Sequence, residues 1–295
     1  MTWHFVQNRV LVRGAGEMAS GVIRRLVIAG FEVIALEKPA PTCIRRYVCY
    51  AEAFFKEKIT VEGVTAVLVN SAEEAIATTS SRCVLLLVDP KAEQLPVLVP
   101  VAVIDGRMLK QEVDTDLDMA PIVIGLGPGF VAGENCHAAI ETNRGSDLGR
   151  VFYVGYPQAD TGIPASVNGF NHQRVLRSPA DGEFASYCKI TDIVESGQVL
   201  GEVAGVAVVS RIDGIVRGMI HDGLKVSIGQ KIGDVDPRAN KERCYKISDK
   251  ANSIGNATLE ALMVLKAKSV GHTDSRCDKA NVKPQVGLTY QSDQD

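Results

Sequence analysis

Hydrophobic residues in the first half of the chain fall into short continuous runs separated by segments of helical periodicity. Between the first two runs, apolar side chains recur every three or four residues from Met18 to Val27, which predicts an amphipathic helix ending at Gly30. A second helical pattern covers residues 72–78. Because strands that alternate with helices are typical of a parallel sheet, we expect an α/β fold. The apolar runs lie at residues 10–12, 33–36, 83–88 and 97–104.

A glycine-rich turn joins the first apolar run to the first helix. Gly14 allows a tight turn after the strand, and Gly16 removes a side chain where a pyrophosphate would otherwise meet a Cβ atom. Gly21 completes the set of glycines expected to approach the pyrophosphate, at a helix start whose N–H groups attract anions. Glu37 ends the next apolar run, about 20 residues after the glycines, where a carboxylate usually holds a ribose. The unit therefore predicts a Rossmann-like dinucleotide site.

Two features depart from the usual dinucleotide-binding pattern. Ala19 occupies the position of the third glycine, which is an accepted variant. Glu17 would place a negative charge beside any phosphate, unless its carboxylate interacts instead with the positive end of the helix dipole. The alternative is a glycine-rich turn that only packs the strand on the helix, and nucleotide binding is the favoured interpretation.

A second glycine-rich loop follows the apolar residues 122–124. Gly125, Gly127 and Gly129 would allow the backbone to approach another anionic group, so two phosphates or one long ligand are expected. Because Pro128 stands between two of these glycines, a rigid turn without a ligand explains the loop equally well. The cofactor-binding candidates are therefore Gly14, Gly16, Glu17, Gly21, Glu37, Gly125, Gly127 and Gly129.

Four polar residues near predicted strand ends are weak candidates for catalysis. Asp105 follows an apolar run, where ligands of open α/β sheets collect, although a turn-forming role before a glycine is an equally good explanation. Lys110 and Glu141 could also donate a proton. Arg144 could clamp an oxyanion, or it could form a salt bridge with Glu141. No histidine is convincingly placed as a catalyst, so the catalytic residues stay unassigned.

The C-terminal third contains an internal repeat with an offset of 32 residues. The Asp-Gly and Gly-Gln pairs at residues 181–182 and 197–198 recur at 213–214 and 229–230. Two such halves can bury each other's apolar faces, so the repeat predicts a small all-β barrel-sandwich module that resembles the biotinyl and lipoyl carrier domains. Those carriers present a modified lysine between their halves, whereas residues 204–211 contain none. We therefore expect a structural or docking module without covalent biotin or lipoyl.

The predicted fold class is a Rossmann-like parallel sheet followed by the barrel-sandwich module and a C-terminal helix. Helical spacing covers residues 256–266, and the chain after about residue 270 is polar and aperiodic, which is typical of a disordered tail. The predicted parts are a nucleotide-binding α/β region at 1–175, the module at 176–240, a helical segment at 241–270 and a tail at 271–295.

The composition of the chain narrows the binding partners and the cellular compartment that we expect. The chain of 295 residues has a net charge of -3 and its arginine pairs are isolated, so a nucleic-acid partner is not expected. No apolar run approaches the ~20 residues of a membrane span, so we expect a cytoplasmic protein without a membrane partner. A homo-oligomer is compatible with these features.

Seven cysteines are scattered along the chain without a C-x-x-C pair, which argues against a disulfide framework and a zinc site. We therefore expect buried thiols and no metal. Cys43 and Cys49 flank two arginines that could activate a thiol, so a sulfur carrier or nucleophile is a minor alternative.

Several motifs occur in an order that points to one family. They are the glycine loop at 13–21, the arginine pair at 44–46, the second glycine loop at 125–130, the polar turns at 141–145 and 148–150, and the segment 174–182. This order resembles the selenium-dependent molybdenum hydroxylase accessory proteins of the YqeB type, over roughly residues 9 to 268. Ser146 and the pair at 255–256 depart from the family, which commonly has a histidine and a double glycine there.

The resemblance implies a cytoplasmic maturation factor for a molybdenum hydroxylase, acting in cofactor delivery or when sulfur or selenium is placed on the metal centre. The expected ligand is a dinucleotide, either the molybdopterin dinucleotide or NAD(P), and the expected partner is the hydroxylase apoenzyme or its sulfur or selenium donor. One alternative is an NAD(P)-dependent oxidoreductase. Another is a non-catalytic scaffold that docks a hydroxylase through the repeat module. Whether the chain is an enzyme stays open.

Overall fold

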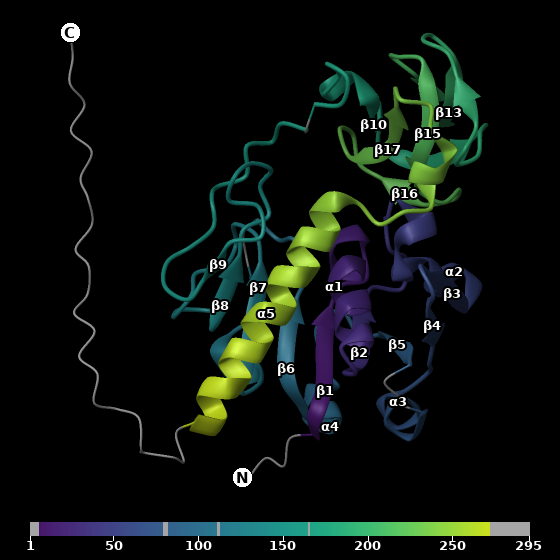
Figure 1. Ribbon diagram of the computed structural model, residues 1–295. Coiled ribbons are helices and arrows are strands. Elements are labelled where there is room, and N and C mark those ends of the chain that lie inside the picture. The colour runs from purple at the N-terminus through teal and green to yellow at the C-terminus, as the bar shows by residue number, and fades with distance from the viewer. Residues whose placement is uncertain (1–5, 79–81, 111–112, 165, 272–295) are drawn as a thin grey trace, which may run out of the picture.

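The computed structural model describes residues 6–78, 82–110, 113–164 and 166–271 (Figure 1). One large sheet contains β1 (Val6–Arg13), β2 (Glu32–Glu37), β3 (Lys58–Val61), β4 (Val64–Leu68), β5 (Cys83–Val88), β6 (Pro100–Asp105), β7 (Ile122–Leu126), β8 (Ala138–Ile140) and β9 (Val151–Phe152). Its nine strands lie in the order β3-β4-β5-β2-β1-β6-β7-β8-β9. Neighbours from β4 to β8 are parallel, and the edge strands β3 and β9 are antiparallel to theirs.

Helices cover both faces of this sheet. On one face, α1 (Glu17–Ile28), which follows β1, lies beside α5 (Asp249–Gly271), which comes from the far end of the described chain (Figure 1). The other face carries α3 (Ala72–Thr78) and α4 (Leu95–Leu98). The remaining short helices are α2 (Ala53–Lys56), η1 (Arg46–Val48), η2 (Tyr50–Glu52), η3 (Leu117–Met119), η4 (His172–Arg174) and η5 (Lys241–Cys244).

Two glycines make the contact between α1 and α5 close. A Cβ atom at Gly21 would lie 2.3 Å from the carbonyl oxygen of Ala251, and one at Gly255 would lie 2.6 Å from the carbonyl oxygen of Gly21. Since any side chain at these positions would push the two backbones apart, the crossing requires glycine on both helices.

The repeat region forms two antiparallel sheets of four strands each. The first contains β10 (Val175–Arg177), β17 (Lys231–Asp236), β15 (Gly214–Met219) and β12 (Ile193–Val194), and the second contains β14 (Val206–Val209), β13 (Val199–Val203), β11 (Gly182–Ser186) and β16 (Lys225–Val226). The repeat offset maps one sheet onto the other, strand by strand. It also maps hydrogen bonds, because Asp181 accepts from the N–H of Ile228 at 2.8 Å as Asp213 accepts from that of Ser196 at 2.7 Å.

The predicted fold class, a Rossmann-like parallel sheet followed by a barrel-sandwich module and a C-terminal helix, is wrong. The large sheet is mixed, because Glu62 and Gly63 both have positive φ (43° and 85°) and form a two-residue turn that folds β3 back on β4. Strand pairing divides the repeat region into two separate antiparallel sheets instead of the expected module. The last helix begins at Asp249, not near residue 256, and its buried side chains belong to the core of the large sheet.

Some boundaries also differ from the sequence pattern. The apolar run at 97–104 is divided between α4 and β6, because Val99 between them has a φ of 41°. The predicted domain boundaries stay a prediction, and residues 272–295 of the predicted tail lie outside the described residues. Within the described part of the chain, no helix combines the length and the apolar character needed to cross a membrane.

Candidate functional site

The glycine-rich turn after β1 lies at the carboxyl end of the central strands. Gly14 has a φ of 97°, and its N–H donates to the carbonyl of Leu36 at 2.7 Å, which ties the turn to β2. Gly16 is the N-cap residue of α1, with φ -69° and ψ -176°, and no side chain caps this helix within the described residues. A Cβ atom at Gly16 would meet no atom within 4 Å. The start of α1 is therefore open to a ligand.

A pocket of about 470 Å³ lies beside this turn. Its walls come from the β1–α1 turn, the end of β2, residues 41–43 and residues 106–109, and we call it the glycine-loop pocket. The volume falls within the range of small-molecule sites, about 300–1,000 Å³. Of the cofactor-binding candidates, Gly14, Gly16, Glu17 and Glu37 line the pocket together.

Glu37 lies at the end of β2 and holds the glycine turn in place. One of its carboxylate oxygens accepts from the N–H of Ala15, and the other accepts from the N–H of Lys38, both at 3.0 Å. A carboxylate oxygen offers two lone pairs, so each oxygen can still accept a ribose hydroxyl. Glu37 thus positions the turn, and its contact with a ribose stays a prediction.

Arg45 balances the charge of Glu17 beside the glycine turn. Its guanidinium donates to the Glu17 carboxylate at 2.9 Å and to the backbone carbonyls of Arg243 and Lys246, also at 2.9 Å. Burial lowers the pKa of Arg45, and the nearby Glu17 carboxylate acts in the opposite direction. An ion pair with Arg45, which was not predicted from the sequence, therefore neutralises the Glu17 charge that would otherwise repel a phosphate.

Packing explains the other predicted glycines. Gly21 faces α5, as described above. A Cβ atom at Gly125 would lie 2.0 Å from the buried Phe130 ring, and one at Gly129 would lie 2.7 Å from a backbone carbonyl oxygen. Gly127 has a φ of 91°, which favours glycine. The rigid turn that the sequence offered as an alternative thus accounts for the second loop.

Asp105 is fully buried and already bonded. It accepts from the guanidinium of Arg107 at 2.5 Å, from the N–H of the same residue at 3.0 Å, and from the hydroxyl of Thr115 at 2.7 Å. The buried Arg13 and the partly exposed Asp114 complete this cluster, with a separation of 2.8 Å between them. Asp105 therefore forms the turn and positions Arg107 on the pocket wall, and it is not available to donate a proton to a ligand.

Asp114 should make this cluster sensitive to acid. Burial raises its pKa, but the hydrogen bonds and charges of Arg107 and Arg13 outweigh burial and lower the pKa to about 2. Because the pKa of Asp114 is lower in the folded protein than in the unfolded chain, the ionised carboxylate stabilises the folded state. This stabilisation is complete above the unfolded pKa of about 3.9 and is lost as the pH falls through the folded pKa of about 2. Since the side chain is 52% exposed, we expect Asp114→Asn to lower the free energy of unfolding by no more than about 1 kcal/mol at pH 6. Denaturant titrations should show this difference shrinking toward pH 2, and a difference independent of pH would contradict the assignment.

Two further catalytic candidates lie outside the glycine-loop pocket. Lys110 is exposed and pairs with Asp160 at 2.5 Å. Glu141 is buried, and its two oxygens accept from the N–H groups of Asn143 and Gln158 at 2.6 and 2.7 Å. Glu141 therefore links two loop segments by hydrogen bonds, and it does not line the glycine-loop pocket.

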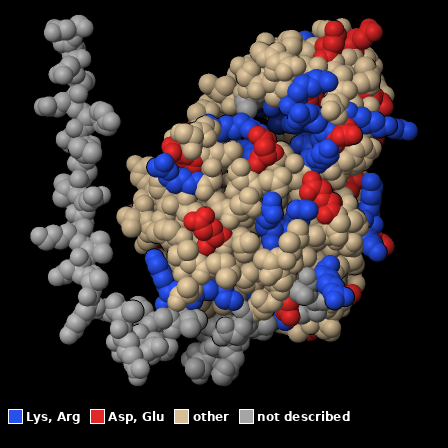
Figure 2. Space-filling model, in the orientation of Figure 1, with Lys and Arg blue, Asp and Glu red and all other residues tan. Residues whose placement is uncertain are grey.

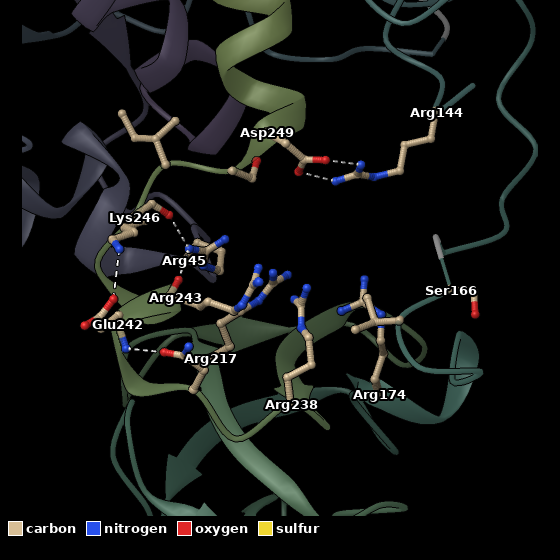
Figure 3. A pocket seen from close by; sticks show the side chains of 14 residues that line it. Arg45, Arg144, Ser166, Arg174, Arg217, Arg238, Glu242, Arg243, Lys246 and Asp249 are labelled. Atoms are coloured by element: carbon tan, nitrogen blue, oxygen red, sulfur yellow. Dashed lines mark hydrogen bonds and ion pairs between the residues drawn. The ribbon is translucent and has the colours of Figure 1, made fainter. Parts of the chain in front are cut away.

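Arg144 belongs to a second site, at the start of α5. Its guanidinium donates to both carboxylate oxygens of Asp249, at 2.7 and 2.8 Å, so its salt-bridge partner is Asp249 and not Glu141, which the sequence offered as one alternative. Other cationic side chains converge on the same space from the antiparallel sheets and from the loop after β2 (Figure 3). We call this site the basic cleft. Its cationic residues are Arg45, Arg144, Arg174, Arg217, Lys231, Arg238, Arg243, Lys246 and Lys250, and its acidic residues are Glu17, Asp160, Glu242 and Asp249.

The basic cleft consists of two adjoining cavities of about 430 and 590 Å³. Arg144, Arg174 and Arg217 line both cavities. The space-filling view shows Lys and Arg side chains gathered around a hollow beneath the antiparallel sheets (Figure 2). Glu17 and Met18 line both the cleft and the glycine-loop pocket, so the two sites are neighbours.

Two buried carboxylates on β17 fix the arginines that rise from the sheets. Asp234 accepts from Arg174 through one oxygen and from Arg217 through the other, the latter at 2.6 Å. Asp236 accepts from Arg238 at 2.8 Å. Each aspartate is only 1% exposed. These ion pairs hold the guanidinium groups in set positions at the floor of the cleft.

The basic cleft was not predicted from the sequence. Its arginines come from elements far apart in the chain, and a net charge of -3 conceals a local excess of positive charge. A signal was nevertheless present, because three of the motifs that carry the family resemblance, at 44–46, 141–145 and 174–182, each contribute an arginine to the cleft.

Cys43 and Cys49 form a disulfide, which the cysteine pattern did not predict. It closes the loop that holds Arg45, and Cys43 lines the glycine-loop pocket. Burial raises the pKa of the Cys136 thiol to about 12, as expected of an unreactive core cysteine. Across the described ranges, no group of three or more histidine, cysteine, aspartate or glutamate side chains is arranged to hold a metal ion.

Solved structures give only weak similarities. An aspartoacylase family protein from Mesorhizobium loti is 10% identical, with a TM-score of 0.25 over 79% of this chain and 86% of that protein. A succinylglutamate desuccinylase/aspartoacylase from Rhodobacter sphaeroides is 15% identical, with a TM-score of 0.21 over 49% of this chain and 60% of that protein. No family model matches the chain.

Sequence comparison gives a much stronger similarity. The chain is 46% identical over 264 residues to the uncharacterized protein YqeB of Escherichia coli K12. The aligned part covers 90% of this chain and 49% of YqeB, so the chain spans about half the length of this curated relative. The chain is thus a homologue of YqeB, in agreement with the order of its motifs.

Proposed function

We propose that this chain binds a dinucleotide in the glycine-loop pocket and serves as a cytoplasmic accessory factor in the maturation of a molybdenum hydroxylase. The observation that carries the binding proposal is the open space at Gly16, where a Cβ atom would meet nothing within 4 Å at the start of an uncapped helix. A helix start with free space in front of it favours an anionic group.

The residues around the pocket fit a dinucleotide. Gly14 and Gly16 would approach the pyrophosphate, and Glu37 would accept a ribose hydroxyl with its remaining lone pairs. Lys38 adds positive charge to the pocket wall, and the guanidinium of Arg107, paired with Asp105 and Asp114, also lies there. The ion pair of Glu17 with Arg45 removes the repulsion that Glu17 alone would cause.

The maturation role rests on the order of the motifs, which resembles that of the selenium-dependent molybdenum hydroxylase accessory proteins of the YqeB type. The molybdopterin dinucleotide is the proposed ligand, and the hydroxylase apoenzyme or its sulfur or selenium donor is the proposed partner. An NAD(P)-dependent oxidoreductase has less support, because Asp105 and Glu141 are buried with both carboxylate oxygens bonded within the protein. The proposed role is therefore binding and delivery.

Replacing Gly16 tests the binding proposal. Any residue can adopt the backbone conformation at this position, so Gly16→Ala and Gly16→Val should fold like the unchanged protein. The alanine and valine side chains should fill the pocket progressively. We expect the valine variant to weaken binding of the molybdopterin dinucleotide at least tenfold, about 1.4 kcal/mol, with a smaller loss for alanine. Calorimetric titration with that ligand, NAD, NADP and FAD measures the effect.

The outcomes separate the alternatives. Binding of NAD or NADP alone would favour an oxidoreductase, and a folded protein that binds none of these ligands would favour a docking scaffold. The maturation role is tested separately in cells that lack this protein. Hydroxylase activity there should fall and should return with the unchanged chain but not with Gly16→Val, and full activity without the protein would contradict the role.

A further inference from the structure

The basic cleft supports an inference that goes beyond the dinucleotide pocket. We propose that the cleft is a separate binding site for an anion with two or more linked phosphate groups, such as pyrophosphate or the phosphate chain of a nucleotide. The proposal rests on the excess of cations in the cleft, on their fixed positions and on the scarcity of apolar surface there.

Positive charge in the cleft exceeds the carboxylates that could neutralise it. Most of its arginines pair with Glu17, Asp234, Asp236 or Asp249. Arg243, Lys231 and Lys250 also line the cleft, yet their side chains make no hydrogen bond or ion pair with the described residues. These three cations are therefore available to a ligand.

The cations are also crowded. The Nε atom of Arg45 is buried and has no hydrogen-bond partner within the described part of the chain. Burial lowers the pKa of Arg45, and the neighbouring Arg217 lowers it further. Burial and the charge of Arg144 likewise lower the pKa of Lys250. A bound anion would relieve these repulsions, because opposite charge at short range favours the protonated forms.

The donors are held ready for a ligand. Asp234 and Asp236 anchor arginines on the floor of the cleft. Asp249 anchors Arg144 on the opposite side (Figure 3). Guanidinium groups bind phosphate oxygens through paired N–H donors, and side chains that are already ordered lose less entropy on binding. Because the donors approach from two sides, an anion with several phosphate groups would contact more of them than a single phosphate.

The lining explains why the ligand should be recognised by its phosphates. The apolar side chains that line the two cavities of the cleft are Met18, Ile163, Pro164, Val167 and Ile247, and the cleft has no aromatic ring in its lining. It therefore offers little surface on which a nucleotide base could stack. A polycarboxylate presents similar charges with a different spacing, so citrate serves as the discriminating comparison.

The test is a calorimetric titration of the full chain with pyrophosphate, tripolyphosphate, orthophosphate and citrate. We expect pyrophosphate to bind at least tenfold more tightly than orthophosphate or citrate. Arg243→Gln and Lys250→Gln should each weaken pyrophosphate binding about fivefold, since each removes one unpaired cation. Arg211→Gln is the matched control, because Arg211 is an exposed arginine outside the cleft, and it should bind like the unchanged protein.

Three results would overturn the proposal. They are the absence of saturable pyrophosphate binding, equal affinity for citrate, and an equal loss in the Arg211→Gln control. Gly16→Val distinguishes this site from the glycine-loop pocket. If pyrophosphate binding survives that substitution, the ligand lies in the cleft whatever the fate of the dinucleotide proposal, and if binding is lost, the phosphates lie at the glycine turn and the cleft proposal fails.

Discussion

Gly21→Ala should lower the free energy of unfolding by about 3 kcal/mol, the upper part of the range for overpacking a well-packed contact. The new Cβ atom would lie 2.3 Å from the carbonyl oxygen of Ala251, an atom of the α5 backbone that cannot rotate away. In an exposed helix the same substitution would stabilise the protein by up to about 1 kcal/mol, because alanine has the higher helix propensity. The expected change in the free energy of unfolding is therefore opposite in sign to the change that helix propensity alone would give.

Gly16→Ala is the matched control for this experiment. It adds the same methyl group at the start of the same helix, where the φ of -69° is unstrained and no atom lies within 4 Å. Its stability should fall by no more than about 1 kcal/mol, because alanine is less favourable than glycine at an N-cap position but meets no clash there. Urea denaturation of both variants measures the difference, and a Gly21→Ala protein of unchanged or higher stability would show that α1 and α5 do not cross as described.

Asp234→Ala should cost about 3 to 5 kcal/mol, as expected when one partner of a buried ionic network is removed. Asp234 is 1% exposed and binds Arg174 with one oxygen and Arg217 with the other. Without this carboxylate, two neighbouring guanidinium groups would lose their shared counter-charge. Thermal and denaturant unfolding should show the loss, and added salt should reduce it by screening the repulsion between the arginines.

Asp213→Ala provides the comparison within the same pair of sheets. Asp213 is exposed, and one of its oxygens accepts a single hydrogen bond from the N–H of Ser196 at 2.7 Å. Its removal should cost only about 1 kcal/mol. If both substitutions had the same small effect, the arginines at the floor of the cleft would not depend on Asp234 for their charge balance.

Local pattern was sufficient for features that depend on residues close together in the chain. The glycine turn, the helix from Glu17 and the carboxylate at Glu37 lie where the spacing placed them, because one strand, one turn and one helix determine their geometry. The 32-residue repeat likewise corresponds to matching strands and matching hydrogen bonds in the structure. The hairpin at Glu62 and Gly63 is also encoded locally, in a two-residue turn, although it was not predicted from the sequence.

By itself, then, the sequence determined most of the short elements, the repeat and four of the residues that line the glycine-loop pocket, Gly14, Gly16, Glu17 and Glu37. The tertiary structure alone decided that α5 packs against α1 and that Arg45, Arg144 and Arg217 meet in one basic cleft. The physical reason is that periodicity shows which face of an element is apolar but not which distant element will cover it. Burial of those apolar faces and ion pairs between residues far apart in the chain bring the cations together. Neither composition nor net charge reveals such a local excess of positive charge.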